Sequence, residues 1–220
     1  MKTKSEQLFE RFLITNKVPF QKVEEVKEKA CHRPDYLILV GDLKLMVEVK
    51  ELTEDESFGV VKDPSSPNIL SHSRIIGAHV RDRINRSKKQ IRYGADQGIP
   101  SILLIYNNID PIFQVHGTES HDFIAAMYGE ITFLIDKNTR KRTDWFHGRN
   151  SELQYTKNTS FSAVGHLSDR SGNVSVTLFE NIYSKVGVPY DLLPSCFEVK
   201  RVEVSNEPLS FILHQPDLPK

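Results

Sequence analysis

Short apolar runs separated by turn residues predict β-strands along much of the chain. Two runs, residues 36–40 and 43–47, are split by a Gly-Asp pair, which is typical of a tight turn between antiparallel strands. We extend this predicted hairpin to residues 30–40 and 43–51. Further strands are predicted at residues 20–26, 101–106, 131–135, 161–167, 174–179 and 196–204. The runs at 101–106 and 131–135 are continuous, as in strands buried on both faces.

Apolar residues three and four apart predict three helices. Ser5 is the predicted N-cap of the first helix, whose apolar face consists of Leu8, Phe9, Phe12 and Leu13. The second is expected at residues 74–97 and the third at 122–128. This order of elements predicts an α/β core over residues 1–136. Residues 137–220 are then a β-rich extension packed on the core within one structural domain.

Three ionisable residues meet at one end of the predicted hairpin. Asp35 begins one strand, and Glu48 and Lys50 lie near the end of the other. Side chains two residues apart share a face, and the antiparallel return brings Asp35 beside them. Two carboxylates and one ammonium suit a divalent cation held against a phosphate. The alternative is a surface strand on which Glu48 and Lys50 pair only with each other.

The predicted helix at residues 74–97 has the strongest charge asymmetry in the chain. Among many cations it has two acids, Asp82 and, in its last turn, Asp96. The cations are Arg74, Arg81, Arg83, Arg86, Lys88, Lys89 and Arg92. Such a helix is expected to contact a phosphate backbone; alternatively, its cations pair with acids of the preceding loop. That loop, residues 52–73, is either a flap ordered by binding or a disordered insertion.

Bulk composition narrows the class of protein. The 220 residues carry 29 basic and 29 acidic side chains, so net charge does not indicate a partner. The two cysteines, Cys31 and Cys196, are far apart in the sequence, which favours reduced thiols. The N-terminus lacks the apolar core of a signal peptide, and no apolar stretch approaches membrane-spanning length. We therefore expect a soluble, cytoplasmic protein.

The motifs and their order resemble a known family. Pro34-Asp35 and Glu48-Val49-Lys50, with a helix before them and a basic helix and an apolar strand after them, resemble the PD-(D/E)-x-K nuclease superfamily. The resemblance covers roughly residues 5–106. It implies a restriction-endonuclease-like core, a central mixed β-sheet flanked by helices. It also implies a Mg²⁺-dependent nuclease, with Mn²⁺ as a substitute ion and DNA favoured over RNA as substrate.

The resemblance also implies metal ligands. Asp35 and Glu48 would bind the ion, with the backbone carbonyl of Val49 as a third ligand. The family carries an acid on the first helix, and here Glu6 is favoured, with Glu10 as the alternative. Either acid would bind through water or hold a second ion.

The remaining implied roles belong to Lys50 and to the basic helix. Lys50 either orients or deprotonates the attacking water, or stays charged and stabilises the phosphate. Gln90 matches a glutamine of some family members, which would position the water or touch the phosphate. The expected contacts with the nucleic-acid backbone are Arg83, Arg86, Lys88, Lys89 and Arg92.

Two other functions remain open. A catalytically inactive nucleic-acid-binding module on the same fold would keep the basic helix, because fold does not determine function. A protein-interaction module would use the β-rich C-terminal third as its interface. A homodimer is a further expectation, because enzymes that cut both strands of a duplex often pair two sites by two-fold symmetry.

Overall fold

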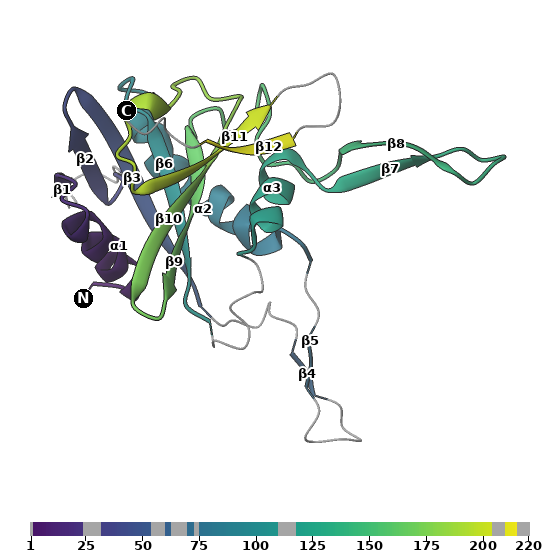
Figure 1. Cartoon of the computed structure of the whole chain (residues 1–220), viewed down its shortest axis with the longest axis horizontal. Coiled ribbons are helices and arrows are strands. Elements are labelled where there is room, and N and C mark those ends of the chain that lie inside the picture. The colour runs from purple at the N-terminus through teal and green to yellow at the C-terminus, as the bar shows by residue number, and fades with distance from the viewer. Residues whose placement is uncertain are drawn as a thin grey trace, which may run out of the picture.

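A large mixed β-sheet forms the centre of the computed structural model (Figure 1). The structure describes residues 2–23, 32–53, 60–62, 70–72, 75–109, 118–203 and 210–214. The strands of the eight-stranded sheet, in spatial order, are β1 (Phe20–Lys22), β2 (Tyr36–Val40), β3 (Leu43–Leu52), β6 (Ser101–Asn107), β9 (Ala163–Arg170), β10 (Asn173–Glu180), β11 (Phe197–Glu203) and β12 (Ser210–His214).

Helices lie on both faces of this sheet. They are α1 (Lys4–Thr15), α2 (Ala78–Ala95) and α3 (Ser120–Tyr128), with a short 3₁₀ helix at Tyr190–Leu192. Two small antiparallel pairs lie outside the sheet: β4 (Val60–Lys62) with β5 (Leu70–His72), and β7 (Ile131–Ile135) with β8 (Arg142–His147). The fold is thus α/β, with a mixed central sheet flanked by helices. Among the helices of the described residues, none has the length and apolar character needed to cross a membrane.

Strands β3, β6 and β9 run parallel to one another and form the middle of the sheet. Every residue of β6 is buried, which confirms the prediction of a strand covered on both faces. Its side chains alternate between two cores: Ile102 and Leu104 lie in the core on the α1 side, and Leu103 and Ile105 lie in the core on the α2 and α3 side.

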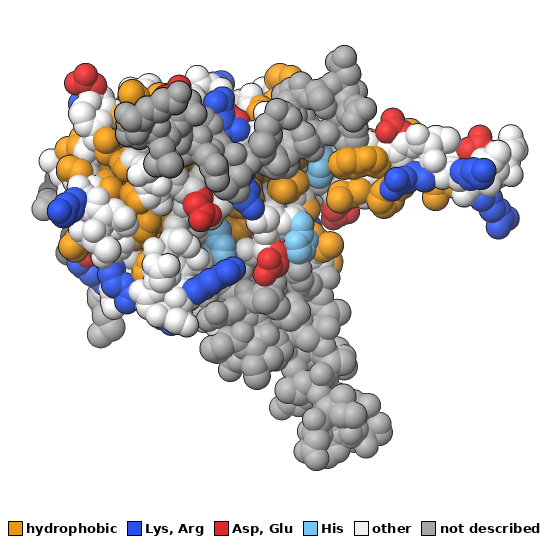
Figure 2. All heavy atoms as spheres, in the orientation of Figure 1, with side chains coloured by type: hydrophobic (Ala, Val, Ile, Leu, Met, Phe, Trp, Pro, Cys, Tyr) orange, Lys and Arg blue, Asp and Glu red, His pale blue; other side chains and the backbone are white. Residues whose placement is uncertain are grey.

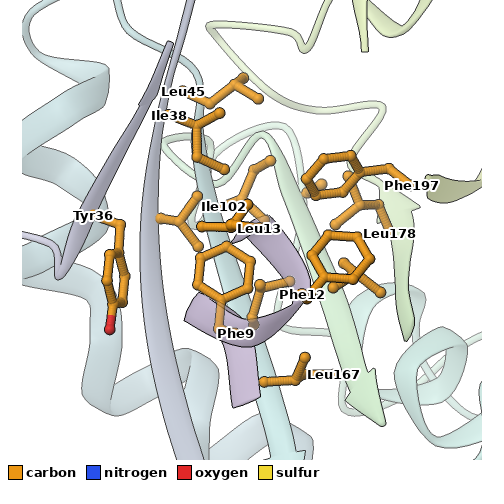
Figure 3. Close-up of a cluster of buried hydrophobic side chains, with 14 of the residues drawn as sticks. Phe9, Phe12, Leu13, Tyr36, Ile38, Leu45, Ile102, Leu167, Leu178 and Phe197 are labelled. Carbon is orange, nitrogen blue, oxygen red and sulfur yellow. The ribbon is translucent and has the colours of Figure 1, made fainter. Parts of the chain in front are cut away.

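Helix α1 closes the first core. Its Phe9, Phe12 and Leu13 point into the cluster shown in Figure 3, toward residues from the strands. The predicted apolar face is confirmed, but the predicted N-cap is wrong. Thr3 caps the helix, because its side chain and that of Glu6 form a reciprocal capping box, and Ser5 is buried inside the first turn.

Other predicted bounds shift or fall outside the described residues. Helix α2 occupies the middle of the predicted range 74–97, and Gly77 precedes it with a left-handed φ of 72°. Arg74 and Cys31 lie outside the described residues, as do most of the loop at 52–73 and part of the strand predicted at 20–26.

The C-terminal third contributes directly to the central sheet. The predicted hairpin at residues 161–167 and 174–179 is confirmed as β9 and β10, and the strand at 196–204 as β11. Strand β9 lies next to β6, so residues on both sides of position 136 build one sheet. The division into a core and an extension stays a prediction.

The prediction of a buried strand at residues 131–135 is wrong in its burial. Strand β7 forms at that position, but Ile131, Phe133 and Ile135 are 56%, 51% and 63% exposed. An apolar run shows that a strand is favoured, whereas burial depends on what packs against it. Here β7 pairs with β8 alone rather than with the central sheet.

His166 on β9 is a partly buried titratable group at the edge of the core on the α2 and α3 side. Its ring lies 5.7 Å from that of Phe123, centroid to centroid. Burial lowers the pKa of His166 to about 4, and the charges of Arg170 and Lys200 act in the same direction. The folded protein therefore keeps this imidazole neutral.

This burial predicts an acid-sensitive contribution to stability. Below about pH 6.5 the unfolded chain binds a proton at His166 before the folded chain does, so folding stability falls as pH drops toward 4. Urea unfolding measures the free energy of unfolding at pH 7 and at pH 4. The decrease between the two should be about 2–3 kcal/mol smaller in His166→Gln than in the wild type. The matched His32→Gln, at an exposed site, should follow the wild type. Parallel curves for wild type and His166→Gln would contradict this assignment.

Candidate functional site

The hairpin of β2 and β3 brings Asp35 and Glu48 together. Tyr36 pairs with Val47, so Asp35 lies one position further along, opposite Glu48. The Asp35 carboxylate accepts a hydrogen bond from the backbone amide of Val49 at 2.8 Å, which fixes it to β3. The carboxyl groups of Asp35 and Glu48 lie within hydrogen-bonding reach of each other. The convergence predicted from the motif is therefore present.

Lys50 lies on the same face as Glu48. Its Nζ is 2.5 Å from Oε1 of Glu48. The side chain of Glu48 is 2% exposed and that of Lys50 is 31% exposed, so the ammonium lies between the buried carboxylate and solvent. Val47 and Val49 belong to the core on the α1 side, so alternation places Glu48 and Lys50 on the side of α2.

Burial dominates the electrostatics of this acidic pair. Desolvation and, after it, the charge of Asp35 raise the pKa of Glu48 to about 7, against the opposing effect of Lys50. Desolvation also raises the pKa of Asp35, against the Val49 amide and the Lys50 charge. One ammonium cannot neutralise two carboxylates. The site therefore favours an additional positive charge, either a proton or a cation.

Helix α2 lies antiparallel to β3 and covers this site. Near its end, a Cβ at Gly94 would lie 2.8 Å from Sδ of Met46, and near its start Arg83 Nε donates to the carbonyl of Glu51 at 3.2 Å. From Arg83 to Gly94 the helix rises about 16 Å, and from Met46 to Glu51 the strand extends about 16 Å. The helix and the strand therefore cover the same distance between these two contacts, and this spacing places Gln90 beside Glu48.

Three polar atoms along this interface are buried without a hydrogen-bond partner among the described residues. They are Oε2 of Glu48, Oε1 of Gln90 and Oγ of Ser87. Leaving a buried polar atom unpaired costs about 1–3 kcal/mol. Such atoms are rare in native structures, and a ligand or a buried water at this interface would complete their hydrogen bonding.

The sequence pattern does not identify two residues of this region. Ser87 lies among the buried apolar residues along one side of α2. A single hydroxyl at such a position in the sequence is the signal by which it could have been predicted. Arg33, two residues before Asp35, has a buried Nε without a partner in the described ranges. Its guanidinium lies 5.5 Å from the ring centroid of Tyr93 on α2. No motif points to Arg33.

The two candidate acids of α1 are both engaged with other groups. Glu6 accepts from Lys22 at 2.7 Å and from the backbone amide of Thr3 at 2.8 Å, and its charge raises the pKa of Asp35. Glu10 accepts from the hydroxyl of Tyr36 at 3.0 Å. In the described part of the chain, no three acidic, His or Cys side chains form a metal-binding group.

The first-helix ligand therefore stays a prediction. The same holds for the carbonyl of Val49, whose amide binds Asp35 and whose side chain is buried in the α1 core.

The cations of α2 fall into two groups. Arg83 and Arg86 pair with Asp82 on the same helix at 2.6 and 2.9 Å, and Arg81 pairs with Glu130 at 3.5 Å. The acids of the preceding loop, with which the alternative pairs these cations, lie outside the described residues. Outside these ion pairs lie Lys88, Lys89 and Arg92, which form no ion pair with any described residue. Lys89 and Arg92 are exposed. A basic surface thus remains open to a partner on this helix.

Comparison with known proteins finds no matching family model, no matching curated protein and no matching solved structure. The geometry of the site and the motif it contains are therefore the basis for assigning a function.

The buried acidic pair is expected to destabilise the folded protein, so removing one of its charges should increase the free energy of unfolding. Glu48→Gln removes one of two neighbouring buried charges and leaves Lys50 beside Asp35. At pH 8 in EDTA, the free energy of unfolding should rise by about 1–3 kcal/mol, because Glu48 then no longer ionises in a desolvated place. Asp42→Asn, at an exposed turn position, is the matched control and should leave stability unchanged. A clear loss of stability in Glu48→Gln would mean that the carboxylate is already well compensated.

Proposed function

We propose that this chain is a metal-dependent nuclease of the PD-(D/E)-x-K type, built on a restriction-endonuclease-like core. It would hydrolyse phosphodiester bonds of nucleic acid, DNA in preference to RNA. The observation that carries the proposal is the buried pair of Asp35 and Glu48 with Lys50 at its solvent side. Among the described residues, Lys50 is the one cation in contact with this pair, so a bound cation would balance the second negative charge.

The residues fit a divalent metal ion. Oε2 of Glu48 is buried without a partner among the described residues, and hard cations such as Mg²⁺ prefer carboxylate oxygens. Asp35 and Glu48 would hold Mg²⁺, or Mn²⁺ in its place, with the Val49 carbonyl and a water-mediated Glu6 or Glu10 as further ligands. A bound divalent ion supplies Lewis-acid stabilisation of the charge that develops on a phosphate.

Lys50 would act on the substrate side of this pair. Its ammonium is partly exposed, whereas the carboxylate that it contacts is buried, so it is the first of the three groups that an approaching phosphate meets. In that place it either orients or deprotonates the attacking water, or stabilises the charged phosphate in the transition state. The unpaired Oε1 of Gln90, level with Glu48, would hold the water.

The open basic surface of α2 would bind the phosphate backbone. Lys88, Lys89 and Arg92 supply charge without ion pairs to described residues, and Arg86 is 68% exposed although it contacts Asp82. Arg83 is 11% exposed and donates to the Glu51 carbonyl, so it would mainly hold α2 on β3. Contacts of this kind weaken as salt rises.

A catalytically inactive binding or interaction module is the second candidate. The observation that favours it is the engagement of Glu6 and Glu10 by Lys22 and Tyr36, which leaves the acidic pair without a third carboxylate among the described residues. Such a module would bind nucleic acid through α2 and would take up no Mg²⁺ or Mn²⁺ at Asp35 and Glu48.

The setting of the enzyme is part of the proposal. Cys196 is a free thiol, which suits a reducing compartment, and we place the activity in the cytoplasm. A homodimer would supply two sites for cutting two strands of a duplex.

Substitution of the motif tests the proposed chemistry. Asp35→Ala and Lys50→Ala should each lower Mg²⁺-dependent cleavage of DNA by about 10²–10⁴-fold, because each removes a ligand or an acid–base group. The assay uses circular single- and double-stranded DNA and RNA, with Mg²⁺, Mn²⁺ or EDTA, and circular dichroism monitors the fold.

The chain offers matched controls on the same hairpin. Asp42→Ala and Lys44→Ala change the same residue types at exposed positions and should keep full activity. Undiminished cleavage by a folded Lys50→Ala protein would refute the catalytic assignment.

A further inference from the structure

The pair of β7 and β8 forms an arm, defined here as residues 131–147, that extends away from the central sheet (Figure 1). Neither strand pairs with any other described strand. An isolated two-stranded hairpin is only marginally stable in water. A partner surface that packs against the arm would therefore stabilise it.

Apolar side chains are exposed along the strands of the arm (Figure 2). Half of the large exposed apolar residues of the described chain lie here: Ile131, Phe133, Leu134, Ile135 and Phe146. Contiguous exposed apolar surface of this kind marks a binding site rather than ordinary surface composition.

Figure 2 shows several Lys and Arg side chains on the outer part of the arm, with acidic side chains among them. Lys137, Arg140, Lys141 and Arg142 lie within six residues, and none forms an ion pair with a residue that the structure describes. Arg142 instead lies 5.4 Å from the ring centroid of Phe133.

The one acid in the turn is already used. Asp136 accepts hydrogen bonds from the amides of Asn138 and Thr139 and from the Thr139 hydroxyl, at 3.0, 2.7 and 2.9 Å. These bonds lower the pKa of Asp136 and keep its charge directed into the turn. The tip thus presents its positive charge outward.

We propose that the arm grips double-stranded DNA, with its tip in the major groove. This inference rests on the proposed function and names its substrate as duplex DNA. Charge complementarity selects the occupant, because unpaired cations at the tip match a polyanion and repel the same tip of a second copy. The B-DNA major groove, about 12 Å wide, admits a two-stranded ribbon, whereas the deep, narrow groove of duplex RNA does not.

The two parts of the arm would then have different tasks. Lys137 and Lys141 contact phosphates on the rims of the groove. Phe133 and Ile135 lie on β7, where Ile135 pairs with Arg142 beside the turn, and meet apolar groups of the bases, such as thymine methyls. The arm adds affinity for long duplexes without touching the acidic pair of Asp35 and Glu48.

Binding of a fluorescent 30-bp DNA duplex by the full chain in EDTA tests the proposal without cleavage. Lys137→Glu/Lys141→Glu should weaken binding at least about tenfold at 0.1 M salt and reduce the slope of log K against log salt by about 2. Lys44→Glu/Lys185→Glu makes the same charge change at exposed positions of the body and should bind as the wild type does. Equal binding by both double variants would overturn the proposal.

A second variant and a second substrate separate the possible failures. Phe133→Ser/Ile135→Ser should weaken duplex binding and leave the sedimentation coefficient unchanged; a shift from dimer to monomer with binding intact would assign the arm to a second copy and overturn the proposal. A short single-stranded oligonucleotide with Mn²⁺ reports the chemistry alone. Cleavage of it with no arm-dependent duplex binding overturns only this inference. Arm-dependent binding without cleavage supports this inference and refutes the nuclease.

Discussion

The carboxyl groups of Asp35 and Glu48 lie close together in a buried position at the end of the β2–β3 hairpin, and the ammonium group of Lys50 contacts Glu48. The backbone amide of Val49 fixes Asp35, and the hairpin register fixes Glu48 opposite it. Folding therefore holds together two charges that repel each other, and the pKa of each is raised. A protein keeps such an arrangement at a cost in stability, which is characteristic of binding and catalytic sites.

The rest of the fold holds this pair in place and limits its access to water. Core residues on both faces of β3 and β6 fix the strands, and α2 lies in step with β3 over the acidic pair. Ser87 and Gln90, whose buried oxygen atoms have no hydrogen-bond partner among the described residues, lie on this helix. The same helix presents Lys89 and Arg92 to solvent, so one element would both complete the site and face a polyanion.

Local pattern predicts the hairpin and its three ionisable residues, because strand alternation and a Gly-Asp turn determine which side chains share a face. Local pattern does not predict the exposure of β7 or the position of β9 beside β6. Both depend on which strands pair across long separations in the sequence. The position of Gln90 beside Glu48 depends on how α2 packs against β3, and no local sequence pattern determines that packing. The Thr3 capping box is readable from the sequence, but Ser5 has the same preference for the N-cap and competes with it.

Anomalous diffraction from crystals of the full chain grown with Mn²⁺ tests the central claim most directly. The account predicts a single strong peak about 2.0–2.3 Å from carboxylate oxygens of both Asp35 and Glu48, with Lys50 Nζ moved off Glu48. No peak at that position at millimolar Mn²⁺, with the contact between Glu48 and Lys50 intact, would contradict it.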